Sequence, residues 1–90
     1  MKKAIITVVG YDKVGIIAGV CNLLAENNVN ILDLTQTILS GDFNMTMIVD
    51  VTGLSVEFAD LADRLAAEGE KLGVQIRMQS EEIFHMMHRI

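Results

Sequence analysis

The chain has 90 residues, a length that suits one domain. Hydrophobic residues make up 51% and charged residues 21%, which is typical of a globular protein and excludes a disordered one. Seven Lys and Arg against twelve Asp and Glu give a net charge of −5. This charge argues against nucleic acid and against an anionic membrane surface as partners, because both bind a basic face.

The sequence also limits where the protein works. Cys21 is the only cysteine, so one chain can build neither a disulfide nor a four-cysteine zinc site. The apolar run after Lys3 stops at Gly10, which is too short for a signal peptide. No stretch reaches the roughly 18 apolar residues of a membrane span. We therefore expect a cytoplasmic protein.

The first half of the chain begins with a strand and a helix. Residues 4–9 are mostly β-branched, which predicts a strand. A loop follows over residues 10–15, and Asp12 is expected to cap the next helix. Apolar residues at helical spacing predict that helix over residues 14–27.

Two glycines lie four residues apart at the start of this helix. Gly15 and Gly19 share one side of it. In a membrane-spanning helix this spacing would indicate dimerisation, but no span is present. We expect the two glycines to allow close packing of the helix on a sheet.

The middle of the chain predicts a hairpin. Residues 29–39 form a strand whose apolar positions break strict alternation, so a bulge is expected near residues 32–33. Residues 40–42 form a turn in which glycine supplies the positive φ. Residues 43–51 form the third strand, with alternate side chains facing the core: Phe43, Met45, Met47, Val49 and Val51.

The second half adds a helix, a strand and a short end. Ser55 is expected to cap a helix that stops at Gly73. Residues 74–81 alternate as a fourth strand, and residues 82–90 predict a short C-terminal helix or tail. The apolar stripe of the helix comprises Phe58, Leu61, Ala62, Leu65, Ala66 and Leu72.

The order βαββαβ predicts the fold. Two split βαβ units interleave into a four-stranded antiparallel sheet with both helices on one face, an α+β, ferredoxin-like arrangement over residues 1–90. The other face is then either solvated or covered by a second copy of the chain, and we favour a dimer. Its residues are Thr7, Asn44, Thr46, Gln75, Arg77 and Gln79, with Ile5, Val9 and Ile48 as apolar contacts.

Three segments carry a resemblance to a known family. Residues 10–20, with Asp-Lys-x-Gly before a helix, and Val29-Asn30-Ile31 at the next strand resemble the ACT domain, a small regulatory module that binds amino acids. Residues 80–90 resemble the end of free-standing bacterial ACT proteins. The resemblance implies a non-enzymatic regulatory or sensory homodimer.

The resemblance also implies a ligand site. Where ACT domains bind a small molecule such as an amino acid, it lies between subunits, at the loop after the first strand and the start of a neighbour's second strand. These positions are Asp12, Lys13, Val14 and Gly15, with Asn30 and Ile31 opposite. Many members have Pro where this chain has Val14. Some ACT domains only dimerise, so the alternative is a purely structural dimerisation or protein-interaction domain.

The residues themselves allow such a site. The N–H groups of Gly15, Ile16 and Ile17 open a helix and carry partial positive charge, so a carboxylate could bind them. The side chain of Asn30 offers a donor and an acceptor. Against this, Asp12 could take the same N–H groups as a cap and repel an anion. Both interpretations stay open here.

Other chemistries find little support in the sequence. His85 and His88, with Glu81, have metal-binding spacing, but a third ligand outside the tail is missing, so no metal or other cofactor is predicted. An acylphosphatase-like enzyme needs an arginine in the first loop, and the loop has none. RNA binding on such a sheet needs stacking aromatics, and the open face offers Asn44 and Thr46 instead.

Overall fold

The computed structural model describes residues 2–82, and its elements follow the predicted order. The predicted terminal helix or tail, apart from Glu82, lies outside the described residues. The elements are β1 (Lys3–Tyr11), α1 (Ile16–Glu26), β2 (Asn30–Leu39), β3 (Asp42–Asp50), α2 (Phe58–Leu72) and β4 (Val74–Ser80).

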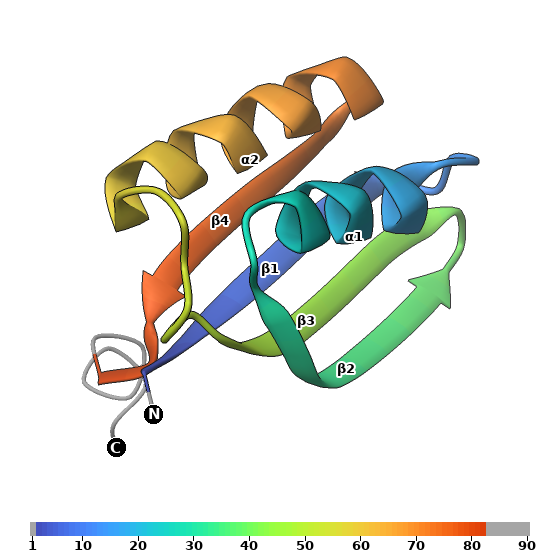
Figure 1. Ribbon diagram of the computed structural model, residues 1–90. Coiled ribbons are helices and arrows are strands. Elements are labelled where there is room, and N and C mark those ends of the chain that lie inside the picture. Colours follow the sequence, from blue (N-terminus) through green and yellow to red (C-terminus); the bar gives the residue numbers. More distant parts are fainter. Residues whose placement is uncertain (1, 83–90) are drawn as a thin grey trace.

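The four strands form one antiparallel sheet in the order β2-β3-β1-β4. Both helices lie on the same face, α2 along β4 and α1 across the central strands (Figure 1). The α+β, ferredoxin-like fold predicted from the sequence is therefore confirmed. The strands β2 and β4 are the two edges of the sheet, and β2 reaches beyond the cover of the helices (Figure 1).

The core follows from strand alternation. On β1, Ile6 faces Met47 of β3 on one side and Met78 of β4 on the other, and all three are buried. The helices add Val20 and Leu24 from α1, and α2 contributes its own buried leucines. The fully buried large side chains are Phe43, Ile6, Ile16, Leu24, Met45, Met47, Leu61, Leu65, Val8, Val20 and Val49.

The predicted bulge and turn of the β2–β3 hairpin are both present. Ile31 pairs with Val49, and Asp33 pairs with Ile48, so Leu32 is the extra residue. At the other end, Ser40 and Gly41 adopt φ angles of 54° and 83° between paired strand ends. Two successive positive φ angles match the twist of a tight two-residue hairpin.

The predicted cap of the first helix is wrong. Helix α1 begins at Ile16, and Gly15 is its N-cap residue, with φ 96° and no side-chain cap. Asp12 lies three positions earlier, and its backbone N–H donates instead to the carbonyl of Gly41 at 2.8 Å. This bond ties the loop to the β2–β3 hairpin.

The predicted cap of the second helix is also wrong. Helix α2 begins at Phe58 after an extended Glu57 that makes no side-chain cap. Ser55 lies two residues too early, and its backbone N–H donates to the carbonyl of Asn27 at 3.2 Å. The loop before α2 is thus held by the end of α1.

The glycines of α1 do not pack on the sheet as predicted. A Cβ on Gly19 would meet the side chains of Glu68 and Leu72, so this glycine faces α2. A Cβ on Gly15 would meet nothing within 4 Å, so this position needs glycine for its φ. Close approach to the sheet occurs on α2, where a Cβ on Gly69 would lie 2.7 Å from the carbonyl oxygen of Val74. No helix within residues 2–82 has the length and apolar character needed to cross a bilayer.

Candidate functional site

The loop predicted to bind a ligand lies at the end of β1, fully at the surface. Residues 12–15 are all exposed, and Val14 is 97% exposed although it is apolar. Tyr11, the last residue of β1, is 79% exposed beside it. Apolar side chains in this position are available to a ligand or a second subunit.

Helix α1 presents unbonded donors next to this loop. Its first intrahelical bond runs from the N–H of Gly19 to the carbonyl of Gly15 at 2.9 Å. The N–H groups of Ile16, Ile17 and Ala18 therefore precede the intrahelical ladder, and no side chain caps them. They carry the partial positive charge of a helix N-terminus. The carboxylate of Asp12 does not occupy them, which removes the obstacle to an anion that the sequence had raised.

The second half of the predicted site lies at the other end of the same subunit. Asn30 opens β2 and pairs with Asp50, which in turn pairs with Lys3 at the start of β1. The loop over residues 12–15 follows the end of β1, and a nine-residue strand spans roughly 30 Å. One chain therefore does not bring Asn30 and Ile31 together with the loop.

Side-chain amides hold the start of β2 in place. Asn27 is 3% exposed, and its amide donates to the carbonyl of Leu23 at 2.8 Å. Its side-chain oxygen accepts a hydrogen bond from Arg64 of α2 at 3.2 Å. The amide of Asn28 donates to the carbonyl of Gly53 at 2.7 Å, in the loop before α2. The entry to β2 is therefore fixed from both sides.

One carboxylate near Asn30 is electrostatically perturbed. The hydroxyl and the backbone N–H of Thr52 hold the pKa of Asp50 below its ordinary value of 3.8. The backbone bond measures 2.9 Å. Asp50 thus stays ionised beside Asn30, and it closes the corner after β3 as an Asx turn.

The outer edge of β2 is apolar and pairs with no strand within residues 2–82, which the sequence analysis missed. Leu34 and Ile38 pair with the buried residues Met47 and Phe43, so they lie on the helix side of the sheet. They are nevertheless 39% and 50% exposed, because neither α1 nor α2 covers them. The half-exposed Ile17 of α1 lies on that side too. The signal was the run of apolar residues in 31–39, which the sequence analysis used only to predict a bulge.

The apolar contacts predicted for the open face of the sheet differ in their exposure. Of the three, Ile5 is buried, Ile48 is half-buried and Val9 is 48% exposed. His85 and His88 lie outside the described residues. Among residues 2–82, no three His, Cys, Asp or Glu side chains gather where a metal could bind.

Comparison with known proteins decides the family. Residues 2–79 match the sequence model of the ACT domain. The chain belongs to the ACT domain family.

Relatives of this ACT domain support the assignment along its whole length. A UPF0237 protein of Bifidobacterium longum is 56% identical over 90 residues, covering all of both chains. An ACT domain protein from Streptococcus pneumoniae has a solved structure with a TM-score of 0.80 and 44% identity, covering 92% of this chain and 93% of that one. ACT domains are a family of regulatory, small-molecule-binding modules.

The fold of this ACT domain also recurs inside a larger protein. The regulatory subunit of aspartate kinase from Thermus thermophilus, in its ligand-free form, aligns with a TM-score of 0.65. The alignment covers 87% of this chain and 50% of that chain at 20% identity. At that identity the likeness shows the fold alone.

Proposed function

We propose that the protein is a non-enzymatic regulatory or sensory homodimer that binds a small molecule, such as a free amino acid, between its subunits. The observation that carries the proposal is the uncapped N-terminus of α1 beside an exposed loop, with Asn30 at the opposite end of the same sheet. Such a divided site becomes complete only when a second copy supplies its other half.

The edge strand β2 supports one way of pairing. It has ten residues, and no strand of the described part of the chain pairs with its outer edge. Four of its apolar side chains are 39–71% exposed: Leu32, Leu34, Ile38 and Leu39. A long apolar edge of this kind is prone to pair with another strand. Antiparallel pairing of two β2 strands would continue the sheet across a twofold axis.

This pairing would assemble the divided site. In an antiparallel pair, the start of one β2 lies beside the end of the other. The end of β2 leads into Gly41, to which the N–H of Asp12 is bonded. Asn30 and Ile31 of one copy would therefore approach the loop over residues 12–15 of the other, twice per dimer.

The chemistry of the completed site suits an amino acid. The free N–H groups of Ile16, Ile17 and Ala18 would bind its carboxylate. The side-chain oxygen of Asn30 would accept a hydrogen bond from its ammonium group. Gly15 leaves open space for the ligand's backbone atoms.

The exposed apolar edge also favours a second candidate, a dimerisation domain without a ligand. Both candidates predict a dimer, and only the first predicts stabilisation by a small molecule. The test is a thermal-shift screen against the common amino acids at millimolar concentration. A ligand at 100 times its Kd adds about 2.7 kcal/mol, which raises the Tm of a small domain by several degrees.

A subunit-mixing experiment tests the shared site directly. Gly15→Val, which strains a residue at φ 96°, and Asn30→Ala should each abolish binding. Mixing the two variants equally should restore about a quarter of the wild-type sites, because half of the dimers are mixed and half of their sites are intact. Binding unaffected by both substitutions, or no Tm shift with any amino acid, would overturn the ligand part of the proposal.

A further inference from the structure

A separate cavity lies at the end of the sheet where the described chain begins and ends. Its volume is about 360 Å³, at the lower end of the range of about 300–1,000 Å³ typical of small-molecule sites. It is formed within one chain, so it does not depend on a second subunit. The described residues that line it are Lys2, Lys3, Val51, Phe58, Ser80, Glu81 and Glu82.

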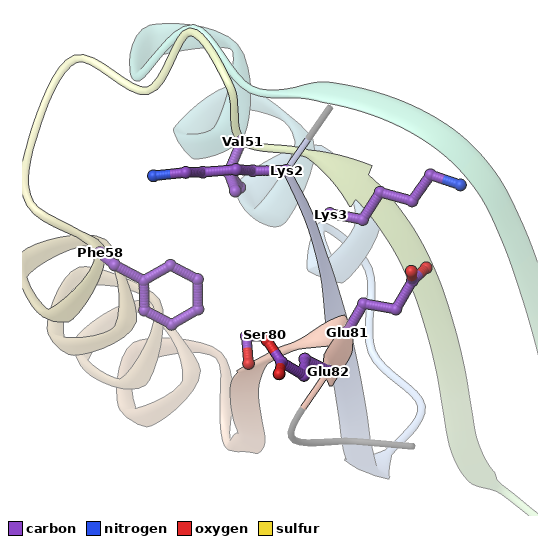
Figure 2. Close-up of a pocket in the computed structure, with 7 residues that line it drawn as sticks. All are labelled: Lys2, Lys3, Val51, Phe58, Ser80, Glu81 and Glu82. Atoms are coloured by element: carbon purple, nitrogen blue, oxygen red, sulfur yellow. The ribbon is translucent and has the colours of Figure 1, made fainter. Parts of the chain in front are cut away.

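The cavity combines an apolar wall with two opposite charges. The ring of Phe58, the first residue of α2, points into it (Figure 2). Lys2 and Val51 lie on one side, and Ser80 and Glu82 lie on the other (Figure 2). Val51 is 7% exposed, so its contribution to the wall is fixed by the core.

The two remaining charged residues of the lining point away. Lys3 and Glu81 extend to the other side of β1 from Phe58 (Figure 2). Strand alternation explains this, because Ala4 and Ser80 are register partners facing the helices, and their neighbours face the open side. Among residues 2–82, the cavity therefore contains one ammonium group, from Lys2, and one carboxylate group, from Glu82.

Two hydrogen bonds fix the position of the Lys2 backbone beside the cavity. Its N–H donates to the hydroxyl of Thr52 at 2.8 Å, and its carbonyl accepts from the N–H of Val51 at 2.8 Å. Within residues 2–82, neither Lys2 nor Glu82 takes part in an ion pair. Both charges are thus available to a ligand.

We propose that this cavity binds a small zwitterion with an apolar body. The carboxylate of the ligand would pair with Lys2 and its ammonium group with Glu82, while its apolar part packs against Phe58 and Val51. Two opposite charges beside an apolar wall complement a zwitterion more fully than a simple anion or cation, because a simple ion can pair with only one of them. This site is distinct from the one proposed between subunits.

The test is a titration of the ¹⁵N-labelled full chain with L-leucine, followed by amide chemical shifts. Saturable shifts are expected at residues 2, 51, 58, 80 and 82. L-leucinamide lacks the carboxylate, isocaproate lacks the ammonium group and glycine lacks the apolar body, so each should bind less tightly. Glycyl-leucine tests whether charges separated by a peptide unit fit better than adjacent ones.

Substitutions identify the charges that act. Lys2→Met and Glu82→Gln should each raise the Kd about threefold to tenfold, the range between an exposed pair and a charge-assisted hydrogen bond. Lys3→Met and Glu81→Gln are the matched controls and should leave the Kd unchanged. Equal effects in both pairs, or none in either, would contradict the proposal.

The same spectra separate this inference from the proposed function. Shifts confined to residues 12–18 and 30–31 would overturn the cavity proposal and support the subunit-interface site. Shifts confined to the cavity residues would support the cavity proposal and count against the subunit-interface site. A titration with neither leucine nor glycyl-leucine shifting the cavity residues would also overturn the proposal made here.

Discussion

The guanidinium group of Arg64 donates a hydrogen bond of 3.2 Å to the side-chain oxygen of Asn27, 37 positions earlier in the chain. The bond joins α2 to the residue that ends α1, and the same amide donates to the carbonyl of Leu23. Asn27 is the buried polar residue of the described chain, and its hydrogen bonds satisfy it. Its burial makes these bonds costly to lose.

Asn27→Ala should therefore lower the free energy of unfolding by about 1–3 kcal/mol, as measured by urea denaturation. Asn22→Ala, at an exposed position of the same helix, is the control and should change it by less than about 0.5 kcal/mol. Equal effects of the two substitutions would show that the hydrogen bonds of Asn27 contribute nothing net.

Two helical glycines should respond oppositely to alanine. At Gly69 the added Cβ meets a backbone carbonyl, which cannot yield, so Gly69→Ala should destabilise by roughly 1–2 kcal/mol despite the better helix propensity. At Gly19 the nearest atom is a carboxylate oxygen at the end of the Glu68 side chain, which can move. Gly19→Ala should be neutral or stabilising by up to about 1 kcal/mol. The Tm of each variant, measured by thermal unfolding, tests both predictions. A Gly69→Ala variant with a higher Tm than the wild type would contradict the first.

The pKa of Asp50 should depend on its neighbour Thr52. The hydroxyl of Thr52 is the largest cause of the lowered pKa, so Thr52→Val should raise it towards 3.8, and Thr52→Ser should keep it low. A carboxyl ¹³C titration of the folded protein measures it.

The same shift has a consequence for stability. A group whose pKa is lower in the folded state stabilises the fold above its unfolded pKa and loses that contribution as the pH falls through the folded value. The difference in free energy of unfolding between the wild type and Thr52→Val should therefore decrease as the pH falls below about 3.8. If this difference increased in acid, the role of the Thr52 hydroxyl in lowering the pKa of Asp50 would be contradicted.

Charges on β2 should separate the subunits. Leu34→Lys or Ile38→Lys should yield a folded monomer, because each side chain is partly exposed and a lysine blocks an edge strand. Val9→Lys, at a similarly exposed position of the open face, should remain a dimer. Sedimentation velocity at several concentrations measures the outcome. Dissociation by Val9→Lys alone would indicate pairing through the open face instead.

The sequence was informative where local chemistry decides. Alternation placed Met45 and Met47 in the core, and the apolar doublet at Ile31 and Leu32 located the bulge. Gly41 marked the hairpin because few other residues accept a positive φ. These features depend on residues only a few positions apart, so they can be predicted from the local sequence.

Features set by distant contacts were mispredicted or missed. Asp12 has the chemistry of a cap, but a backbone bond to Gly41 holds it elsewhere. The exposure of Leu34 and Ile38 depends on where α1 lies over the sheet, which no local pattern reports. The cavity at Lys2 and Phe58 was missed because its walls come from four separate segments of the chain.

The pairing of Ala4 with Ser80 has a practical consequence for handling the protein. The polypeptide enters and leaves the sheet on adjacent strands at one end (Figure 1). A tag, a fused domain or a surface tether attached directly before Lys2 would therefore crowd the cavity and leave the loop over residues 12–15 accessible. Immobilised protein should report on the interface loop, whereas the cavity is best studied with the untethered chain.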